Sequence, residues 1–306
     1  MNPLRSRILI PLLTGLLMAG AALPAVGQEP IVVEDMDGVP VIIEDVSNVA
    51  TLGGVFTETV YALGAQDQLG AIDASSFYPP EALTEKPNFG YYRFLSAEPV
   101  LALGPSLIIG NEETGPPEVV QQLRDAGVPI LLLPDNNDVQ AARDLITTLG
   151  AIFDREQAAV ELVAELDADV AAAAELVAGA EDAPRVLFIL QPPEAPLLVA
   201  GGVTAAGSMI ELAGGTNVYP DFPSYIPMTP EGIAELAPDV ILTTDASVER
   251  LGGWDAFLER PGISQTPAAA DGRVVAMDDL YLLGFGPRTG QAIADLARLL
   301  HPELAP

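Results

Sequence analysis

Cysteine is absent from this sequence, and histidine occurs once, at His301. Without thiols the chain has no disulfides, cysteine nucleophiles or thiolate metal sites, and a domain of this size is stable without disulfides. A single histidine argues against zinc or manganese sites built on histidine clusters and against a Ser-His-Asp triad. We interpret His301, which stands in Leu-Leu-His-Pro, as the end of a helix.

Basic residues are also scarce, because 43 Asp and Glu face only 13 Lys and Arg, for a formal net charge of −30. Such a charge repels nucleic acid and anionic lipid surfaces, so we expect no nucleic-acid partner. Solubility or a salt-adapted source explains the acidity without a specific role. Neighbouring acids such as Asp278 and Asp279 would point to opposite faces of a strand, which gives no reaction geometry. We therefore do not expect an enzyme.

Long apolar runs are limited to one stretch, from Ile8 to about Ala25, which follows Arg5 and Arg7. A positive start, a short hydrophobic core and small residues behind it are typical of a secretory signal peptide, here residues 1–27 with cleavage near Gly27. A membrane anchor is the alternative, since about 18 apolar residues is the lower limit for spanning a bilayer. Two prolines and the cleavage site favour removal. We expect a soluble periplasmic product without a lipid anchor, because no cysteine follows.

The sequence contains an internal repeat, with copies that begin at Glu98 and Glu231, about 133 residues apart. Each copy has leucine five residues and proline seven residues after the glutamate, followed by an apolar run. This pattern predicts a short helix that ends before a proline and leads into a buried parallel strand. Weaker copies begin at Gly54 and Gly202 and read as a glycine-rich turn, a helix and a strand. A further helix and strand are expected after each copy.

Strand and helix units that alternate in this way predict parallel sheets covered by helices, and their repetition predicts two lobes. Between the lobes, residues from about Asp154 to Ala178 lack proline and favour one helix about 35 Å long, bracketed by Gly150 and Gly179. A long helix would make a stiff connection, and an ordinary helix of one large domain is the alternative. The predicted fold is α/β, with two Rossmann-like lobes at residues 30–150 and 182–306 and a bridging helix at residues 151–181.

The segment Gly90-Tyr-Tyr-Arg-Phe-Leu-Ser-Ala-Glu98 resembles the periplasmic haem-binding proteins of ABC haem importers, the HmuT/ShuT type. The resemblance continues through GAIDASSFYP, GPPEVVQQLRDAGVPI, AAGSMIELAGGTN, YIPMTPEGIAELAPDVIL and the region from Gly272 to Pro302. It implies the class III periplasmic binding protein fold with a rigid helix. It also implies capture of ferric haem b, as transported ligand, in the cleft between the lobes and delivery to an ABC permease dimer of the inner membrane. We further expect a monomer, supplied by an outer-membrane haem receptor system.

In that family the tyrosine of a Gly-Tyr-x-Arg motif is the axial ligand of haem iron, which implies this role for Tyr91. Phenolate is a hard donor for Fe(III), but a free phenol has a pKa near 10 and needs a nearby cation to ionise at neutral pH. Arg93, two residues on in an extended segment, would project to the same side and hydrogen-bond the phenolate. Tyr92 is the alternative ligand or a stacking wall.

Some family members add a histidine from the second lobe as a second axial ligand. This chain has none to offer, because we interpret its single histidine, His301, as a helix end, so we expect five-coordinate iron or water as sixth ligand. Tyr225, Met209 or Met228 would approach from that lobe, although methionine at helical spacing usually fills a core. Phe77, Tyr78 and Phe89 would suit a flat porphyrin.

In this class, one exposed glutamate on each lobe pairs with arginines of the permease, and Glu98 and Glu231 occupy those positions. The alternative is a favourable interaction with the helix dipole. Cobalamin or a ferric siderophore is the alternative cargo. A siderophore site usually needs several cations, and Arg93 and Arg288 are the obvious candidates. A structural or adhesive periplasmic protein would leave the tyrosine–arginine segment without a purpose.

Overall fold

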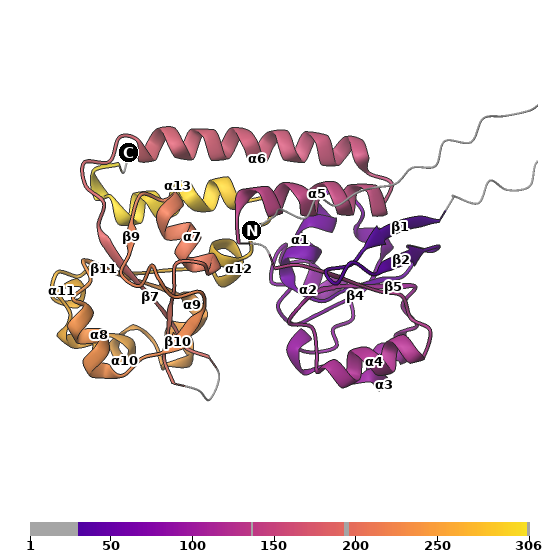
Figure 1. Ribbon diagram of the computed structural model, residues 1–306, viewed down its shortest axis with the longest axis horizontal. Coiled ribbons are helices and arrows are strands. Elements are labelled where there is room, and N and C mark those ends of the chain that lie inside the picture. The colour runs from indigo at the N-terminus through magenta and orange to yellow at the C-terminus, as the bar shows by residue number, and fades with distance from the viewer. Residues whose placement is uncertain (1–29, 136, 193–195, 305–306) are drawn as a thin grey trace, which may run out of the picture. The chain divides into compact units, whose positions relative to one another are not determined.

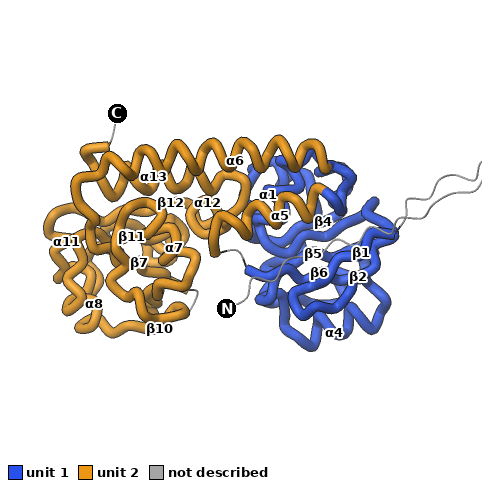
Figure 2. Tube along the Cα trace, turned by 45° about the horizontal axis from the view of Figure 1, so that its top comes forward, with its two compact units in different colours: residues 1–135, 151–155 blue, residues 136–150, 156–306 orange. Residues whose placement is uncertain are grey.

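The computed structural model describes residues 30–135, 137–192 and 196–304 of the chain. The expected signal peptide, residues 1–27, lies outside these described residues. The chain forms two compact units, one of residues 1–135 and 151–155 and the other of residues 136–150 and 156–306 (Figure 2). In the part of the chain that is described, none of the helices has both the length and the apolar character needed to cross a membrane.

Unit 1 is built on a four-stranded sheet in the order β4-β3-β5-β6, and every neighbouring pair is parallel. Helices alternate with these strands, which confirms the predicted α/β class for this half. An antiparallel hairpin of two further strands precedes the sheet and was not predicted. The elements are β1 (Ile31–Glu34), β2 (Pro40–Ile43), β3 (Val49–Thr51), α1 (Gly54–Ala62), η1 (Gln66–Gln68), β4 (Leu69–Ile72), α2 (Ala82–Glu85), η2 (Tyr92–Phe94), α3 (Ala97–Leu103), β5 (Leu107–Asn111), α4 (Pro117–Asp125) and β6 (Ile130–Leu133).

Unit 2 has a parallel core of the same order, β9-β7-β11-β12 (Figure 1). It differs from unit 1 in two strands that the sequence did not predict: β8 pairs antiparallel with β7, and β10 pairs antiparallel with β8. The elements after the long helix are β7 (Arg185–Leu190), β8 (Leu198–Ala200), α7 (Ala205–Leu212), β9 (Thr216–Asn217), β10 (Tyr225–Pro227), α8 (Pro230–Leu236), β11 (Val240–Thr244), α9 (Asp245–Arg250), α10 (Trp254–Leu258), η3 (Ile263–Gln265), α11 (Pro267–Ala270), β12 (Val274–Met277), α12 (Asp279–Leu283), α13 (Thr289–Leu300) and η4 (Pro302–Leu304).

The predicted repeat is present as two helix-strand pairs, α3 with β5 and α8 with β11. Both helices have seven residues, carry the repeated glutamate in the first turn, and end at a residue in the left-handed region. That residue is Gly104 in unit 1 (φ 58°) and Ala237 in unit 2 (φ 43°). A proline follows each of them, and it cannot continue the helix. The two units therefore repeat in backbone conformation as well as in sequence.

The predicted long helix is α6, which runs unbroken from Glu156 to Val177. The preceding helix α5 (Val139–Ile152) contains Gly150, so this glycine, which was expected to bracket the long helix, does not end the helix before it. Glycine inside a helix costs only about 1 kcal/mol, which the surrounding packing outweighs. The break comes instead at Asp154, whose φ of 56° turns the chain.

Helix α6 packs along α13 within unit 2 (Figures 1 and 2). A Cβ at Gly290 of α13 would lie 2.5 Å from the Cβ of Asp169 in α6, so only glycine permits this approach. Next to it, Gln291 Nε2 donates to Asp169 Oδ2 at 2.9 Å. His301 follows the end of α13, as predicted, and its buried Nε2 lies 3.1 Å from the carbonyl oxygen of Ala213. The role of α6 as a separate bridging segment stays a prediction.

Candidate functional site

The carboxyl ends of the parallel strands of unit 1 bring several polar side chains to one edge of the sheet. Asp73 follows β4 directly, the loop from Asn111 to Thr114 follows β5, and Asp135 lies two residues after β6. Asp73 is fully buried and accepts hydrogen bonds from the backbone N–H groups of Gly53 and Ser75, which fixes the start of α1. Asp73 is therefore a structural residue of this edge, and the loop after β5 carries the more accessible groups.

The Tyr91–Phe94 segment lies against this loop. Tyr92 is 8% exposed and packs into the core of unit 1, whereas Tyr91 is 39% exposed. The backbone N–H of Gly115 donates to the carbonyl of Tyr92 at 3.0 Å, and the N–H of Leu95 donates back to the carbonyl of Gly115 at 2.9 Å. The rings of Tyr91 and Tyr92 meet edge to face, with their centroids 4.8 Å apart. One tyrosine thus anchors the segment and its neighbour is presented at the surface of the unit.

Arg93 does not have the extended geometry expected from the sequence, because Tyr92–Phe94 forms a 3₁₀ turn. In this turn the Arg93 Nε–H donates to Tyr92 Oη at 3.2 Å. The guanidinium carbon lies 5.9 Å from the centroid of the Tyr91 ring, within the range of a cation–π contact. The expected hydrogen bond between Arg93 and the Tyr91 hydroxyl is therefore replaced by a contact with the ring.

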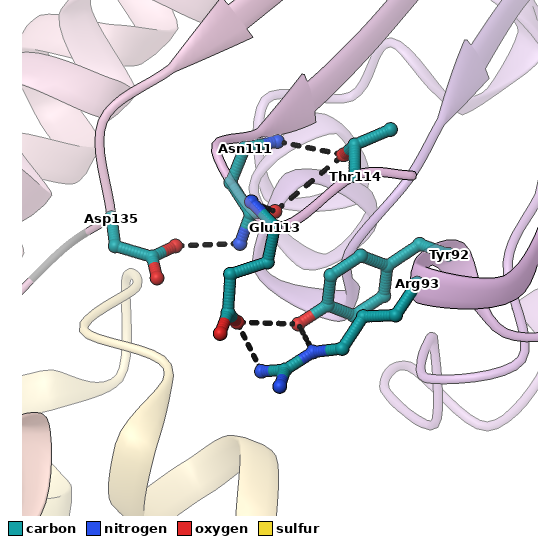
Figure 3. Close-up of polar contacts among 6 residues, drawn as sticks. All are labelled: Tyr92, Arg93, Asn111, Glu113, Thr114 and Asp135. Carbon is teal, nitrogen blue, oxygen red and sulfur yellow. Dashed lines mark hydrogen bonds and ion pairs between the residues drawn. The ribbon is translucent and has the colours of Figure 1, made fainter. Parts of the chain in front are cut away.

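Glu113 forms a cluster with Tyr92 and Arg93, beside Tyr91 (the cluster is drawn without Tyr91 in Figure 3). Glu113 was not predicted as a site residue from the sequence. Its Oε2 accepts a hydrogen bond from Tyr92 Oη at 3.3 Å and forms an ion pair with Nη2 of Arg93. The sequence signal that could have identified Glu113 was its position, two residues after a strand that was predicted to be buried and parallel. Its pairing partner is 20 residues away in the sequence, which no local pattern identifies.

The loop that carries Glu113 is held by its own polar contacts (Figure 3). The backbone N–H of Asn111 donates to Thr114 Oγ1 at 3.1 Å, and the N–H of Glu113 donates to Asn111 Oδ1 at 3.2 Å. Asn111 Nδ2 in turn donates to Asp135 Oδ1 at 2.5 Å, which links the ends of β5 and β6. Glu113 is therefore presented from a constrained loop.

Burial and neighbouring charges separate the roles of these groups. Burial, with the neighbouring Tyr91 adding to it, raises the pKa of Tyr92, so this hydroxyl stays protonated. Burial, together with the charge of Glu113, raises the pKa of Asp135. Burial lowers the pKa of Arg93, but its contacts with Tyr92, Tyr91 and Glu113 outweigh burial and the net shift is upward. The cluster thus offers a fixed cation next to the accessible phenol of Tyr91.

Two of the other aromatic residues predicted for a porphyrin site are exposed in unit 1. Phe77 is 53% exposed and Tyr78 is 42% exposed, whereas Phe89 is partly buried and packs against the core. Single exposed aromatic side chains are common on protein surfaces, so their exposure leaves them accessible to a ligand but does not assign them to one. Their part in a site stays a prediction.

The residues predicted from the second lobe have mixed positions in unit 2. Met209 is 1% exposed in the main hydrophobic core of that unit, so it fills the core, as the alternative interpretation holds. Met228 is partly buried against a second core cluster. Tyr225 is partly exposed, and its ring meets that of Phe188 with centroids 6.2 Å apart. Of these residues we keep only Tyr225 as a candidate contact.

The acidic pair Asp278 and Asp279 has structural roles in unit 2. Asp278 caps α12, where its Oδ1 accepts the N–H of Tyr281 at 2.8 Å. Asp279 Oδ2 accepts the N–H of Ala246 at 3.3 Å, and burial raises the pKa of its carboxyl. The two acids stand at a helix start and not on a strand, and each is used by the local backbone.

Glu98 and Glu231 are both exposed and both stand in the first turn of their helices. Helix α8 has its own cap, because Thr229 Oγ1 accepts the N–H of Gly232 at 3.2 Å. The N-cap of α3, Ser96, makes no such side-chain hydrogen bond. The equivalent exposure of both glutamates agrees with a surface role, and the docking role itself stays a prediction.

Comparison with known proteins identifies relatives that cover most of the chain. A family model described as "Periplasmic binding protein" matches residues 49–281. The structure is similar to the apo form of the periplasmic heme-binding protein RhuT from Roseiflexus sp. RS-1, with 39% identity and a TM-score of 0.79, covering 85% of this chain and 100% of that one.

Two relatives differ in what their names say. The uncharacterized ABC transporter substrate-binding lipoprotein YvrC of Bacillus subtilis is 26% identical, covering 95% of each chain. A cobalamin-binding protein of Halobacterium salinarum is 29% identical, covering 83% of this chain and 69% of that protein. The fold, the family model and these similarities agree, and the chain belongs to the periplasmic binding protein family, with the class III fold.

Proposed function

We propose that this chain is the substrate-binding protein of an ABC importer, that it captures haem outside the cytoplasm, and that it delivers haem to the permease. The family consists of substrate-binding transport proteins, which supports a binding function over an enzymatic one. The similarity to a heme-binding protein at 39% identity supports haem as the cargo. The observation that carries the proposal is Tyr91, a half-exposed phenol with the Arg93 guanidinium over its ring.

In this proposal the Tyr91 oxygen ligates the iron of ferric haem b. A phenolate is a hard anionic donor that suits Fe(III). The guanidinium of Arg93 lies over the ring that carries this oxygen, with its carbon 5.9 Å from the ring centroid. Tyr92 stays protonated in the core and supports the ring of its neighbour. Reduction to Fe(II), a softer ion, would weaken the bond and favour release of the cargo.

Cobalamin is the second candidate cargo, because a relative at 29% identity is named a cobalamin-binding protein. The Tyr91–Arg93 pair favours haem, since it provides an anionic oxygen donor, which suits ferric iron. Titration of the purified chain with hemin and, separately, with cyanocobalamin distinguishes the two. We expect a tyrosinate charge-transfer band with hemin. Binding of cyanocobalamin together with an unchanged hemin spectrum would reverse the assignment.

We also propose the route by which the chain reaches its cargo. Export would end with cleavage near Gly27 and no lipid would be attached, because the sequence contains no cysteine. The mature chain would act as a monomer and receive haem that an outer-membrane receptor system has imported. Mass spectrometry of the exported protein tests the cleavage site and the absence of lipid, and light scattering with and without hemin tests the monomer.

Delivery would depend on Glu98 and Glu231, one exposed carboxylate from each unit, paired with arginines of the two permease subunits. The same residue at the same place in both repeats suits docking onto a two-fold symmetric transporter. Exposed ion pairs of this kind mainly steer association and contribute modestly to affinity.

A further inference from the structure

Glu113 is the charged residue of the cluster that the proposed function has not used. Its side chain is partly exposed, yet one oxygen, Oε2, contacts both Tyr92 Oη and Arg93 Nη2. Arg93 Nε donates to the same Tyr92 hydroxyl. Each of the three groups therefore contacts the other two, in a closed triangle (Figure 3). The Tyr91 ring lies next to this triangle, in contact with the Tyr92 ring.

The triangle determines where the Arg93 guanidinium lies. A long arginine side chain loses up to about 2 kcal/mol of rotamer entropy when it is fixed, and the contacts that fix it must offset that loss. Within the described residues, the polar partners of the Arg93 side chain are Tyr92 and Glu113. The Tyr92 ring is held by the core, and the backbone of Glu113 is held by its hydrogen bond to Asn111.

We propose that Glu113 is a positioning residue for haem binding: by pairing with Arg93 and accepting from Tyr92, it holds the guanidinium over the Tyr91 ring. This inference rests on the proposed function. Glu113 does not touch the iron ligand and acts through Arg93. It also occupies the Tyr92 hydroxyl, which donates to Glu113 and accepts from Arg93, so Tyr91 is the phenol left for the iron.

The length and the charge of the Glu113 side chain can be changed separately. Glu113→Gln keeps the length of the side chain and an oxygen that accepts from both partners, but removes the charge. Glu113→Asp keeps the charge, but a side chain one methylene shorter does not reach both partners. Glu112→Gln and Glu112→Asp are the matched controls, because Glu112 is the exposed neighbour and its side chain makes no hydrogen bond or ion pair among the described residues.

The experiment is a spectral titration of each purified variant with hemin at constant pH and salt. We expect Glu113→Asp to weaken hemin binding about tenfold and Glu113→Gln about threefold or less, since coupled polar contacts are typically worth such factors. Both Glu112 variants should match the wild type. In an Arg93→Ala background, Glu113→Asp should cause no further loss, because the group it positions is gone.

Several results would overturn the inference. One is a loss of hemin affinity in Glu113→Gln with none in Glu113→Asp. Others are equal losses of affinity in both variants, or no loss in either. The last is a loss of affinity in Glu113→Asp that stays as large in the Arg93→Ala background. Thermal unfolding of each variant separates lost folding from lost binding. Nuclear magnetic resonance of the Arg93 Nε–H without hemin should show protection from exchange in the wild type and Glu113→Gln, and none in Glu113→Asp. A wild type that binds no hemin overturns the proposed function as well, whereas hemin binding without this pattern overturns only the role of Glu113.

Discussion

Both units contain a tyrosine whose ring faces a guanidinium and whose hydroxyl donates to a carboxylate. In unit 1 these are Tyr92, Arg93 and Glu113, with the guanidinium carbon 5.5 Å from the ring centroid. In unit 2, Arg288 lies 4.8 Å from the Tyr281 centroid, and Tyr281 Oη donates to Asp295 at 2.9 Å. Burial raises the pKa of both tyrosines. The same three residue types thus form a similar cluster in each half.

The two clusters differ in where they lie and in what stands beside them. In unit 2 the tyrosine belongs to α12 and the carboxylate to α13, where Asp295 also pairs with Arg298 at 2.8 Å, so the contacts link two adjacent helices. In unit 1 the cluster stands at the carboxyl edge of the parallel sheet, and one arginine contacts both the hydroxyl and the carboxylate. Only there does an exposed tyrosine, Tyr91, directly precede it. A tyrosine–arginine–acid cluster therefore does not by itself indicate a site, and in the proposed function it is the additional phenol of Tyr91 that distinguishes unit 1.

The largest effect is expected from a change at Tyr91, the exposed tyrosine that distinguishes the unit 1 cluster from the unit 2 cluster. Tyr91→Phe keeps the ring and removes the donor oxygen, so the charge-transfer band should disappear. Loss of an outer contact of a metal site costs 10- to 100-fold in affinity, so loss of the ligand should weaken hemin binding by at least about a hundredfold. Tyr281→Phe in unit 2 should leave the hemin spectrum unchanged. An unchanged spectrum in Tyr91→Phe, with loss in Tyr92→Phe, would transfer the ligand role to Tyr92.

The next largest effect is expected from Glu98 and Glu231, and it tests whether both units contribute equally to docking. Changing Glu98 or Glu231 alone to Ala should lower haem transport about fivefold or less, because an exposed ion pair contributes up to about 1 kcal/mol. The double change should lower transport roughly tenfold or more. Hemin affinity of the purified variants should stay at the wild-type value. A fall in hemin affinity, or a double variant no worse than either single one, would contradict the docking role.

A smaller effect compares the two hydroxyl groups. Tyr92→Phe removes a hydroxyl that contacts both a cation and a carboxylate in the core, and we expect it to lower the free energy of unfolding by about 1–2 kcal/mol. Tyr281→Phe removes one more exposed hydrogen bond, and we expect a decrease of about 1 kcal/mol or less. Chemical denaturation without hemin measures both. The opposite ranking would show that the unit 2 cluster stabilises its half more strongly.

The smallest expected effect is a change in stability when Gly104 and Ala237, the equivalent helix ends of the repeat, are replaced. Gly104→Ala places a Cβ in open space but at a φ of 58°, so it should destabilise the chain by about 1 kcal/mol. Ala237→Gly relieves the same conformation at a φ of 43° in unit 2, and it should be neutral or stabilising by up to about 1 kcal/mol. Thermal unfolding measures the pair. Changes of the same sign would show that the two helix ends are not equivalent.

Local patterns were sufficient for most of the fold. The helix-to-strand repeat, the proline that follows each helix, and the parallel cores were predicted, since each depends on the polarity and backbone preferences of neighbouring residues. The antiparallel strands β8 and β10 were missed, because short strands gain most of their stability from pairing partners that the sequence does not reveal. The boundary near Gly150 was misjudged for a related reason. Packing outweighed the weak helix propensity of glycine, and Asp154 made the turn instead.

By itself the sequence determined the α/β class, the doubled architecture and the long α6 helix, which depend on residues close together in the chain or on a repeat within it. Its resemblance to a known family implied Tyr91 with Arg93 as the candidate pair. Only the tertiary structure decided which tyrosine is buried, that Arg93 contacts the Tyr92 hydroxyl, and that Glu113 pairs with both. The physical reason is that burial and charge pairing depend on distances across the sheet edge. Glu113 and Arg93, 20 residues apart in sequence, meet because the chain folds β5 between them.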